Sequence, residues 1–220
     1  MSIHARRLLV LALLLPAATP LRAQSFSELC RTIRMVRLGQ WASYALTASS
    51  AQGSTMRLAI IGSETFGDST YYWYEITTEK RDKAPADRTV MQALVAGLGT
   101  ATPSVRSYVV KSGDRPALKV PDLMISMMSR QISQGVASET ARRCSNGVVV
   151  GWETVTVPAG RFRALHVRSA DGDAWVTADV PFGMVRVHGS DGTDMILTGR
   201  GMDAKSSITE QPQEGMGGRH

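Results

Sequence analysis

Hydrophobic and polar residues alternate with a period of two along most of the chain from Gln40 onward. This alternation predicts β-strands, because successive side chains of a strand point to opposite faces of a sheet. The strongest signal is TYYWYEITT at 70–78, which is dense in aromatic and β-branched residues. Residues 89–95 fit a strand and a helix equally well. Other strands are expected at 41–46, 56–62, 105–111, 117–120, 148–157, 162–169, 175–177, 184–188 and 195–199.

Tight turns separate the strands of the C-terminal half. Asp-Gly pairs at 171–172 and 191–192, and Pro-Ala-Gly at 158–160, lie between alternating runs. Turns of this kind join neighbouring antiparallel strands into hairpins. We therefore predict a mainly β fold of the α+β class. It should be one curved antiparallel sheet, or half-barrel, of at least seven strands with a few helices on its concave side.

The segment 25–38 has the period of a helix instead. Ser25 and Glu28 have capping-box spacing at its start, and Gly39 is a natural stop. Its basic residues form a stripe away from the apolar side, which we interpret as a solvated face rather than a contact with acidic lipid headgroups. These basic residues are Arg31, Arg34 and Arg37.

A second helix is expected from Leu123 to about Gln134, with Asp122 as its cap. Its methionines are adaptable, so the helix can serve as a lid over an apolar ligand or simply pack into the core. We expect it to lie across the concave face, where two tyrosines of strand 70–78 share one side. The candidate ligand-binding residues are Met124, Met127, Met128, Tyr72 and Tyr74.

The N-terminus reads as a secretory signal peptide over residues 1–23. Arg6 and Arg7 precede the apolar run 8–15, and Ala23 precedes a plausible cut before Gln24. The apolar run is shorter than the ~20 residues of a membrane-spanning helix. Cleavage removes three arginines and lowers the formal net charge from +6 to +3, which does not favour a nucleic-acid partner. We expect a periplasmic or secreted protein without a transmembrane segment.

The mature chain should form one domain over 24–204, followed by a polar, glycine-rich tail at 205–220 that we expect to be disordered. Its two cysteines, Cys30 and Cys144, are an even number in an exported chain, which predicts a disulfide between them. Two buried free thiols are the alternative.

No catalytic or metal-binding motif is present in the sequence. The aspartates near 171 and 191 fit hairpin turns rather than a calcium loop. His166 and His188 lie on separate predicted strands without further ligands at metal spacing. We therefore expect no metal, no cofactor and no enzymatic activity. An exported hydrolase with an unfamiliar site would become plausible if a histidine and an aspartate met in an open cleft.

Three stretches of the C-terminal half resemble a known group of exported bacterial proteins. GWETVTVPAGRF at 151–162, WVTADVPFGMV at 175–185 and DGTDMILTG at 191–199 resemble exported bacterial proteins similar to the outer-membrane lipoprotein-carrier (Lol-type) superfamily. This resemblance spans roughly residues 145–201 and implies a half-barrel closed by helices over an apolar cavity. The expected function is a periplasmic carrier or binding protein for a lipid or lipoprotein acyl chain. A non-catalytic structural or interaction domain of the envelope, with a filled core and an envelope protein as its partner, is the alternative.

Overall fold

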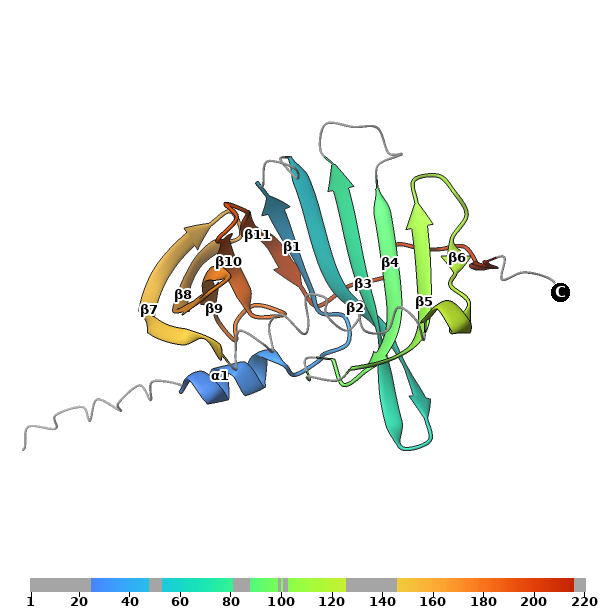
Figure 1. The fold of residues 1–220 in the computed structure, drawn as a ribbon, viewed down its shortest axis with the longest axis horizontal. Helices are drawn as coiled ribbons and strands as arrows, with labels where there is room; N and C mark the ends of the chain where they lie inside the picture. Colours follow the sequence, from blue (N-terminus) through green and yellow to red (C-terminus); the bar gives the residue numbers. More distant parts are fainter. Residues whose placement is uncertain are drawn as a thin grey trace, which may run out of the picture.

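The body of the protein is a single open, strongly curved sheet of 12 strands (Figure 1). A computed structural model describes residues 25–47, 53–80, 88–98, 100, 103–125 and 146–215. One helix, α1 (Phe26–Ile33), precedes the sheet. The strands are β1 (Trp41–Leu46), β2 (Ser54–Phe66), β3 (Ser69–Lys80), β4 (Thr89–Ala96), β5 (Ser104–Ser112), β6 (Leu118–Lys119), β7 (Val148–Val157), β8 (Gly160–Ser169), β9 (Gly172–Val176), β10 (Met184–Gly189), β11 (Asp194–Gly201) and β12 (Gln213–Glu214).

Two antiparallel meanders join at the centre of this sheet. The strand order is β12-β6-β5-β4-β3-β2-β1-β11-β10-β9-β8-β7, so β1 pairs with β11 across about 150 to 160 residues of sequence. Among the described pairings only β12 with β6 is parallel. The mainly β prediction is confirmed, and the ambiguous segment 89–95 is strand β4. Strand β2 continues past Gly62 because a bulge there shifts its register with β3 rather than ending it.

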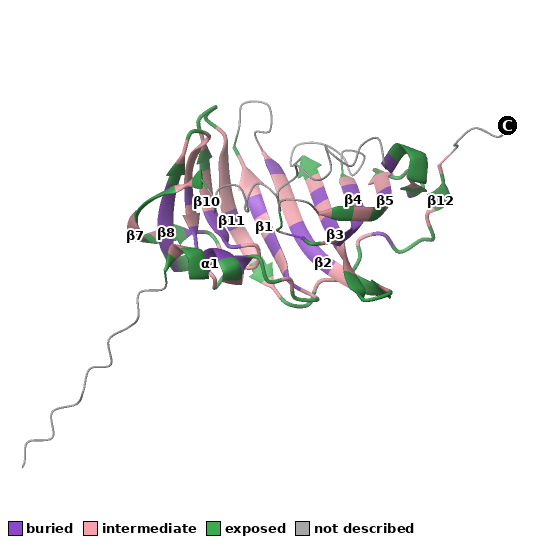
Figure 2. Ribbon diagram, turned by 60° about the horizontal axis from the view of Figure 1, so that its bottom comes forward, coloured by how far each residue is buried: buried purple, intermediate pink, exposed green. Residues whose placement is uncertain are grey.

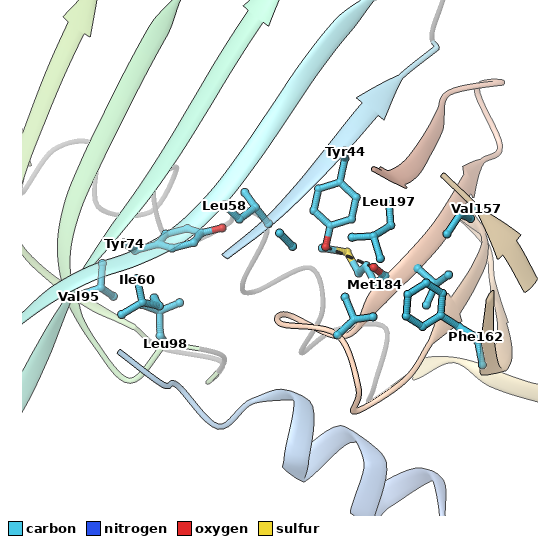
Figure 3. Close-up of a cluster of buried hydrophobic side chains, with 14 of the residues drawn as sticks. Tyr44, Leu58, Ile60, Tyr74, Val95, Leu98, Val157, Phe162, Met184 and Leu197 are labelled. Carbon is cyan, nitrogen blue, oxygen red and sulfur yellow. Dashed lines mark hydrogen bonds between the residues drawn. The ribbon is translucent and has the colours of Figure 1, made fainter. Parts of the chain in front are cut away.

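The largest hydrophobic core lies where strands of both meanders face one another (Figure 3). Tyr44, Leu58 and Leu197 are fully buried in it, from β1, β2 and β11 respectively. Burying each leucine contributes about 1.5–3 kcal/mol. The Tyr44 hydroxyl donates a hydrogen bond to the Met184 carbonyl at 3.3 Å, which satisfies its polar atom and links the two meanders.

Helix α1 packs on one end of the sheet. The Ser25 hydroxyl accepts a hydrogen bond from the Glu28 amide at 3.3 Å, as the capping-box spacing predicts. Leu29 and Ile33 are buried against β8 and β9. The helix ends at Ile33, before the expected limit of residue 38, because Arg34 caps it and the chain then turns towards β1.

Cys30 lies on the same helix and is 1% exposed. It is not a free thiol in the structure. Its expected partner, Cys144, lies outside the described residues, so the pairing of these two cysteines stays a prediction.

The expectation of a disordered tail from residue 205 is wrong for the part that the structure describes. Residues 205–215 cross the outside of the sheet and end in β12 on the edge of β6 (Figure 1). Ile208 is 7% exposed and packs with Val90 and Val109, and the Ser207 amide donates to buried Glu75 at 2.9 Å. These contacts order a polar segment whose composition alone indicates disorder. The domain therefore extends beyond residue 204.

The second expected helix is described only at its start. Residues 122–125 are helical, with Ile125 buried and Met124 50% exposed. Met127, Met128 and the rest of that helix lie outside the described residues, so its position across the concave face stays a prediction. No helix in the described part of the chain is long and apolar enough to cross a membrane.

Candidate functional site

A cavity of about 560 Å³ lies between the end of α1, the loop that joins β9 to β10, and the end of β11. Cavities of ~300–1,000 Å³ are typical of small-molecule sites. Three segments that are distant in sequence supply its walls: residues 32–40, 178–182 and 200–202. The cavity is therefore a product of the tertiary fold, and none of its residues belongs to the predicted ligand-binding set.

Apolar side chains form the inner wall of this cavity. Ile33 comes from α1, and Val180 and Phe182 come from the β9–β10 loop. Ile33 is 8% exposed and Val180 is 2% exposed. Met35 and Met202 also line the cavity, but both are more than half exposed. The cavity lining is thus mixed, with apolar side chains that include two exposed, adaptable methionines beside polar and charged residues.

The β9–β10 loop holds Phe182 in an unusual backbone conformation. Its φ of 62° makes it the only non-glycine residue in the left-handed region within the described part of the chain, a position that is unfavourable by ~1–2 kcal/mol. The Gly183 amide donates to the Val180 carbonyl, and the Gly183 carbonyl accepts from the Thr177 amide, both at 2.9 Å. The Phe182 ring lies 5.8 Å from the ring of Tyr74. Phe182 therefore separates the cavity from the main core.

Polar groups surround the mouth of the cavity. Arg37 and Arg200 are both exposed there, and Gln40 is buried. The Gln40 side chain accepts a hydrogen bond from the Arg37 amide at 3.1 Å, which holds the backbone of this segment. The Arg200 guanidinium donates to the Asp179 carbonyl and lies over the ring of Phe162. Two arginines and one aspartate, Asp179, therefore stand among the residues that line the cavity.

The predicted ligand-binding residues do not gather at one described site. Tyr74 is 8% exposed in the main core, and Tyr72 is half-buried against the same core. The Tyr74 hydroxyl is buried and has no hydrogen-bond partner among the described residues, and burial raises the pKa of Tyr74 well above its usual range. Met124 is 50% exposed, in the short helical segment that follows β6 in the chain. Only Tyr74 approaches the cavity, through its contact with Phe182.

A second feature of interest is a polar cluster on β7, β8 and β9. His166 Nδ1 lies 2.9 Å from Glu153 Oε1, and its Nε2 lies 2.6 Å from Asp173 Oδ1. The imidazole stacks on Trp175, whose indole N–H donates to the other Glu153 oxygen at 2.8 Å. Both ring nitrogens of His166 therefore face carboxylate oxygens.

This arrangement fits a structural tie better than a catalytic or metal site. A general base needs a free nitrogen, and here both nitrogens of His166 are engaged. The two carboxylates lie on opposite sides of the ring, so the three groups do not converge on one ion. No group of three metal ligands occurs among the described residues. His188, on β10, pairs in register with Asp173 of β9, and its side chain contacts Asp194 at 3.0 Å.

The carboxylates of this cluster should make the free energy of unfolding fall as the solution becomes acidic. The hydrogen bonds from Trp175 and then His166 lower the pKa of Glu153, and those from His166 and then Arg168 lower the pKa of Asp173. A carboxyl group with a lowered folded-state pKa stabilises the fold above its unfolded pKa of ~4, and this contribution disappears as pH falls through the folded pKa.

We therefore expect wild-type protein to lose more stability between about pH 5 and pH 2 than the Asp173→Asn variant, as measured by urea unfolding at each pH. Asp68→Asn, in the exposed turn between β2 and β3, is the matched control and should follow the wild-type profile. A wild-type profile parallel to that of Asp173→Asn would contradict the assignment.

Comparisons with known proteins give only distant likenesses. No family model matches the chain, and no curated protein matches it. A candidate lipoprotein from Parabacteroides distasonis has a TM-score of 0.37 and 9% identity, over 77% of this chain and 98% of that chain. A candidate exported protein with a YmcC-like fold from Bacteroides fragilis has a TM-score of 0.34 and 8% identity, over 75% and 96%. The resemblance to the lipoprotein-carrier superfamily stays an interpretation of the sequence.

Proposed function

We propose that this protein is an exported, non-catalytic binding protein for a single amphiphilic molecule with an apolar chain and an anionic headgroup. The observation that carries the proposal is the cavity of about 560 Å³ with buried Ile33 and Val180 inside and exposed Arg37 and Arg200 at its mouth. Fatty acids and lipid acyl chains belong to this chemical class. The signal-peptide reading of residues 1–23 supports export.

The two parts of the cavity match the two parts of such a ligand. Each methylene group moved from water to the apolar wall contributes about 0.8 kcal/mol, so a chain of several carbons supplies useful affinity. Guanidinium groups donate paired hydrogen bonds to carboxylates and phosphates, which orients the headgroup towards Arg37 and Arg200. Met35 and Met202 can adjust their side chains to chains of different shape.

The filled-core alternative rests on a different observation. Large buried side chains such as Tyr44, Leu58 and Tyr74 fill the main core by packing against one another, so the core has no room for a ligand between them. In that case the domain would have a structural or interaction role in the envelope. The two functions differ in whether wild-type protein takes up an apolar probe at the cavity described above.

Binding of a dansyl-labelled fatty acid tests the proposal. We expect wild-type protein to enhance the dansyl fluorescence, and Thr32→Trp to weaken binding about tenfold or more, because Thr32 faces the cavity from α1. Ser27→Trp places the same side chain on the exposed surface of the same helix and is the matched control. Arg37→Ala should weaken binding of the acid about two- to fivefold and leave the corresponding dansyl-labelled alcohol unchanged.

Thermal unfolding of each variant shows whether its fold is retained. A wild-type protein that never takes up the probe would favour the filled-core alternative. Uptake that Thr32→Trp and Ser27→Trp reduce equally would place the ligand elsewhere in the molecule.

A further inference from the structure

Three large apolar side chains are exposed on two neighbouring segments, and two of them, Met35 and Met202, also line the cavity. Met35, Leu38 and Met202 are 54%, 58% and 53% exposed. They belong to two segments that are held side by side, because the Ala204 amide donates to the Gly39 carbonyl at 2.9 Å. Gly39 itself, at φ 81°, approaches the Met202 carbonyl so closely that a Cβ atom would lie 2.4 Å from it. The apolar surface is therefore a built part of the fold.

Positive charge surrounds this apolar surface. Arg37 and Arg200 line the cavity, and Arg31 in the adjoining helix α1 and Arg34 just after it are both exposed. Figure 2 shows that α1 carries exposed positions along its length. Within the described part of the chain, none of these four guanidinium groups pairs with a carboxylate. Two acids lie in the same region and keep their negative charge: Asp179 also lines the cavity and accepts from the Thr177 hydroxyl, and Asp203 accepts from the Trp41 indole. The four arginines therefore outnumber these two carboxylates.

We propose that this face docks on an anionic lipid bilayer, with the cavity mouth towards the membrane. The surface combines exposed Met and Leu side chains with several arginines. This combination of apolar and positively charged side chains binds the interface of an anionic membrane. The basic stripe on α1 alone is an ordinary solvated face, but its continuity with Met35, Leu38 and Met202 gives it an apolar centre. The inference rests on the proposed function, because docking would place the ligand's source beside the cavity.

Sedimentation with lipid vesicles tests the docking. We expect wild-type protein to bind vesicles that contain phosphatidylglycerol at least tenfold more tightly than vesicles of phosphatidylcholine alone, with binding that weakens as salt is added. Arg31→Glu and Arg34→Glu should each weaken binding about fivefold or more, and the double variant Met35→Ser, Leu38→Ser should also lose binding. The matched control is Arg115→Glu with Met124→Ser, which makes the same kinds of change at exposed positions near β6.

Thr32→Trp separates docking from ligand binding, because it fills the cavity and leaves the docking surface intact. Retained vesicle binding by this variant, with loss of the dansyl probe, supports both proposals. Vesicle binding by a wild-type protein that takes up no probe would support docking and contradict the binding function. Equal affinity for the two vesicle types, or unchanged binding by the folded Arg31, Arg34 and Met35–Leu38 variants, would overturn the docking proposal.

Discussion

Replacing Glu75 with alanine is expected to lower the free energy of unfolding by about 3–5 kcal/mol, because it leaves several buried donors without an acceptor. Glu75 is fully buried on β3. Its carboxylate accepts hydrogen bonds from the Gln92 side chain at 2.8 Å and from the Ser207 amide and hydroxyl at 2.9 and 2.7 Å. Arg57 lies 3.7 Å away. This carboxylate therefore anchors the C-terminal segment to the sheet.

Urea unfolding measures the effect, with Glu75→Gln as the conservative variant. The amide retains one acceptor oxygen but turns a donor towards the Gln92 and Ser207 donors, so its loss should be smaller, about 1–3 kcal/mol. Hydrogen exchange of the Ser207 amide should accelerate in the alanine variant. A loss below ~1 kcal/mol, with Ser207 exchange unchanged, would show that the segment is held by Ile208 rather than by Glu75.

Replacing Gly183 with alanine should lower the free energy of unfolding by about 2–4 kcal/mol, from two separate causes. Gly183 has a φ of 78°, in the left-handed region that alanine adopts unfavourably. An added Cβ would also lie 2.6 Å from three side-chain carbons of Ile33 on α1. The second cause would push α1 away from the β9–β10 loop, so probe binding at the cavity should weaken along with stability.

A double-mutant cycle separates these causes. Ile33→Ala alone should lose about 2–5 kcal/mol as a buried truncation, but it removes all three atoms that the new Cβ would meet. In that background, Gly183→Ala should lose only about 1 kcal/mol, the part that belongs to the backbone conformation. Additive losses in the cycle would show that Ile33 moves aside freely and that α1 is not held tightly against the loop.

The short-range features of this fold follow directly from the sequence. The alternation at 70–78 and the Asp-Gly turn at 171–172 correspond to β3 and to the β8–β9 hairpin. The capping-box spacing of Ser25 and Glu28 corresponds to the observed start of α1. Each of these signals depends on residues only a few positions apart, so the local chain carries the whole physical cause.

Composition predicted disorder for the C-terminal segment because the contacts that order it are distant in the sequence. Residues 205–215 are polar and lack periodicity. Even so, Ser207 donates to the buried carboxylate of Glu75, and Ile208 packs against apolar residues of β4 and β5. These partners are about 100 to 130 positions away in the sequence. Their stabilising contacts become apparent only once β3 to β5 are assembled.

By itself the sequence determined the mainly β fold, most of its strands and turns, and the start of α1. It also carried the export signal that we predict for residues 1–23. Only the tertiary structure decided the pairing of β1 with β11 and the position of the cavity, whose walls come from residues 32–40, 178–182 and 200–202. The physical reason is that secondary structure arises from local periodicity, whereas a cavity needs segments with no local relationship to be brought together by the strand order.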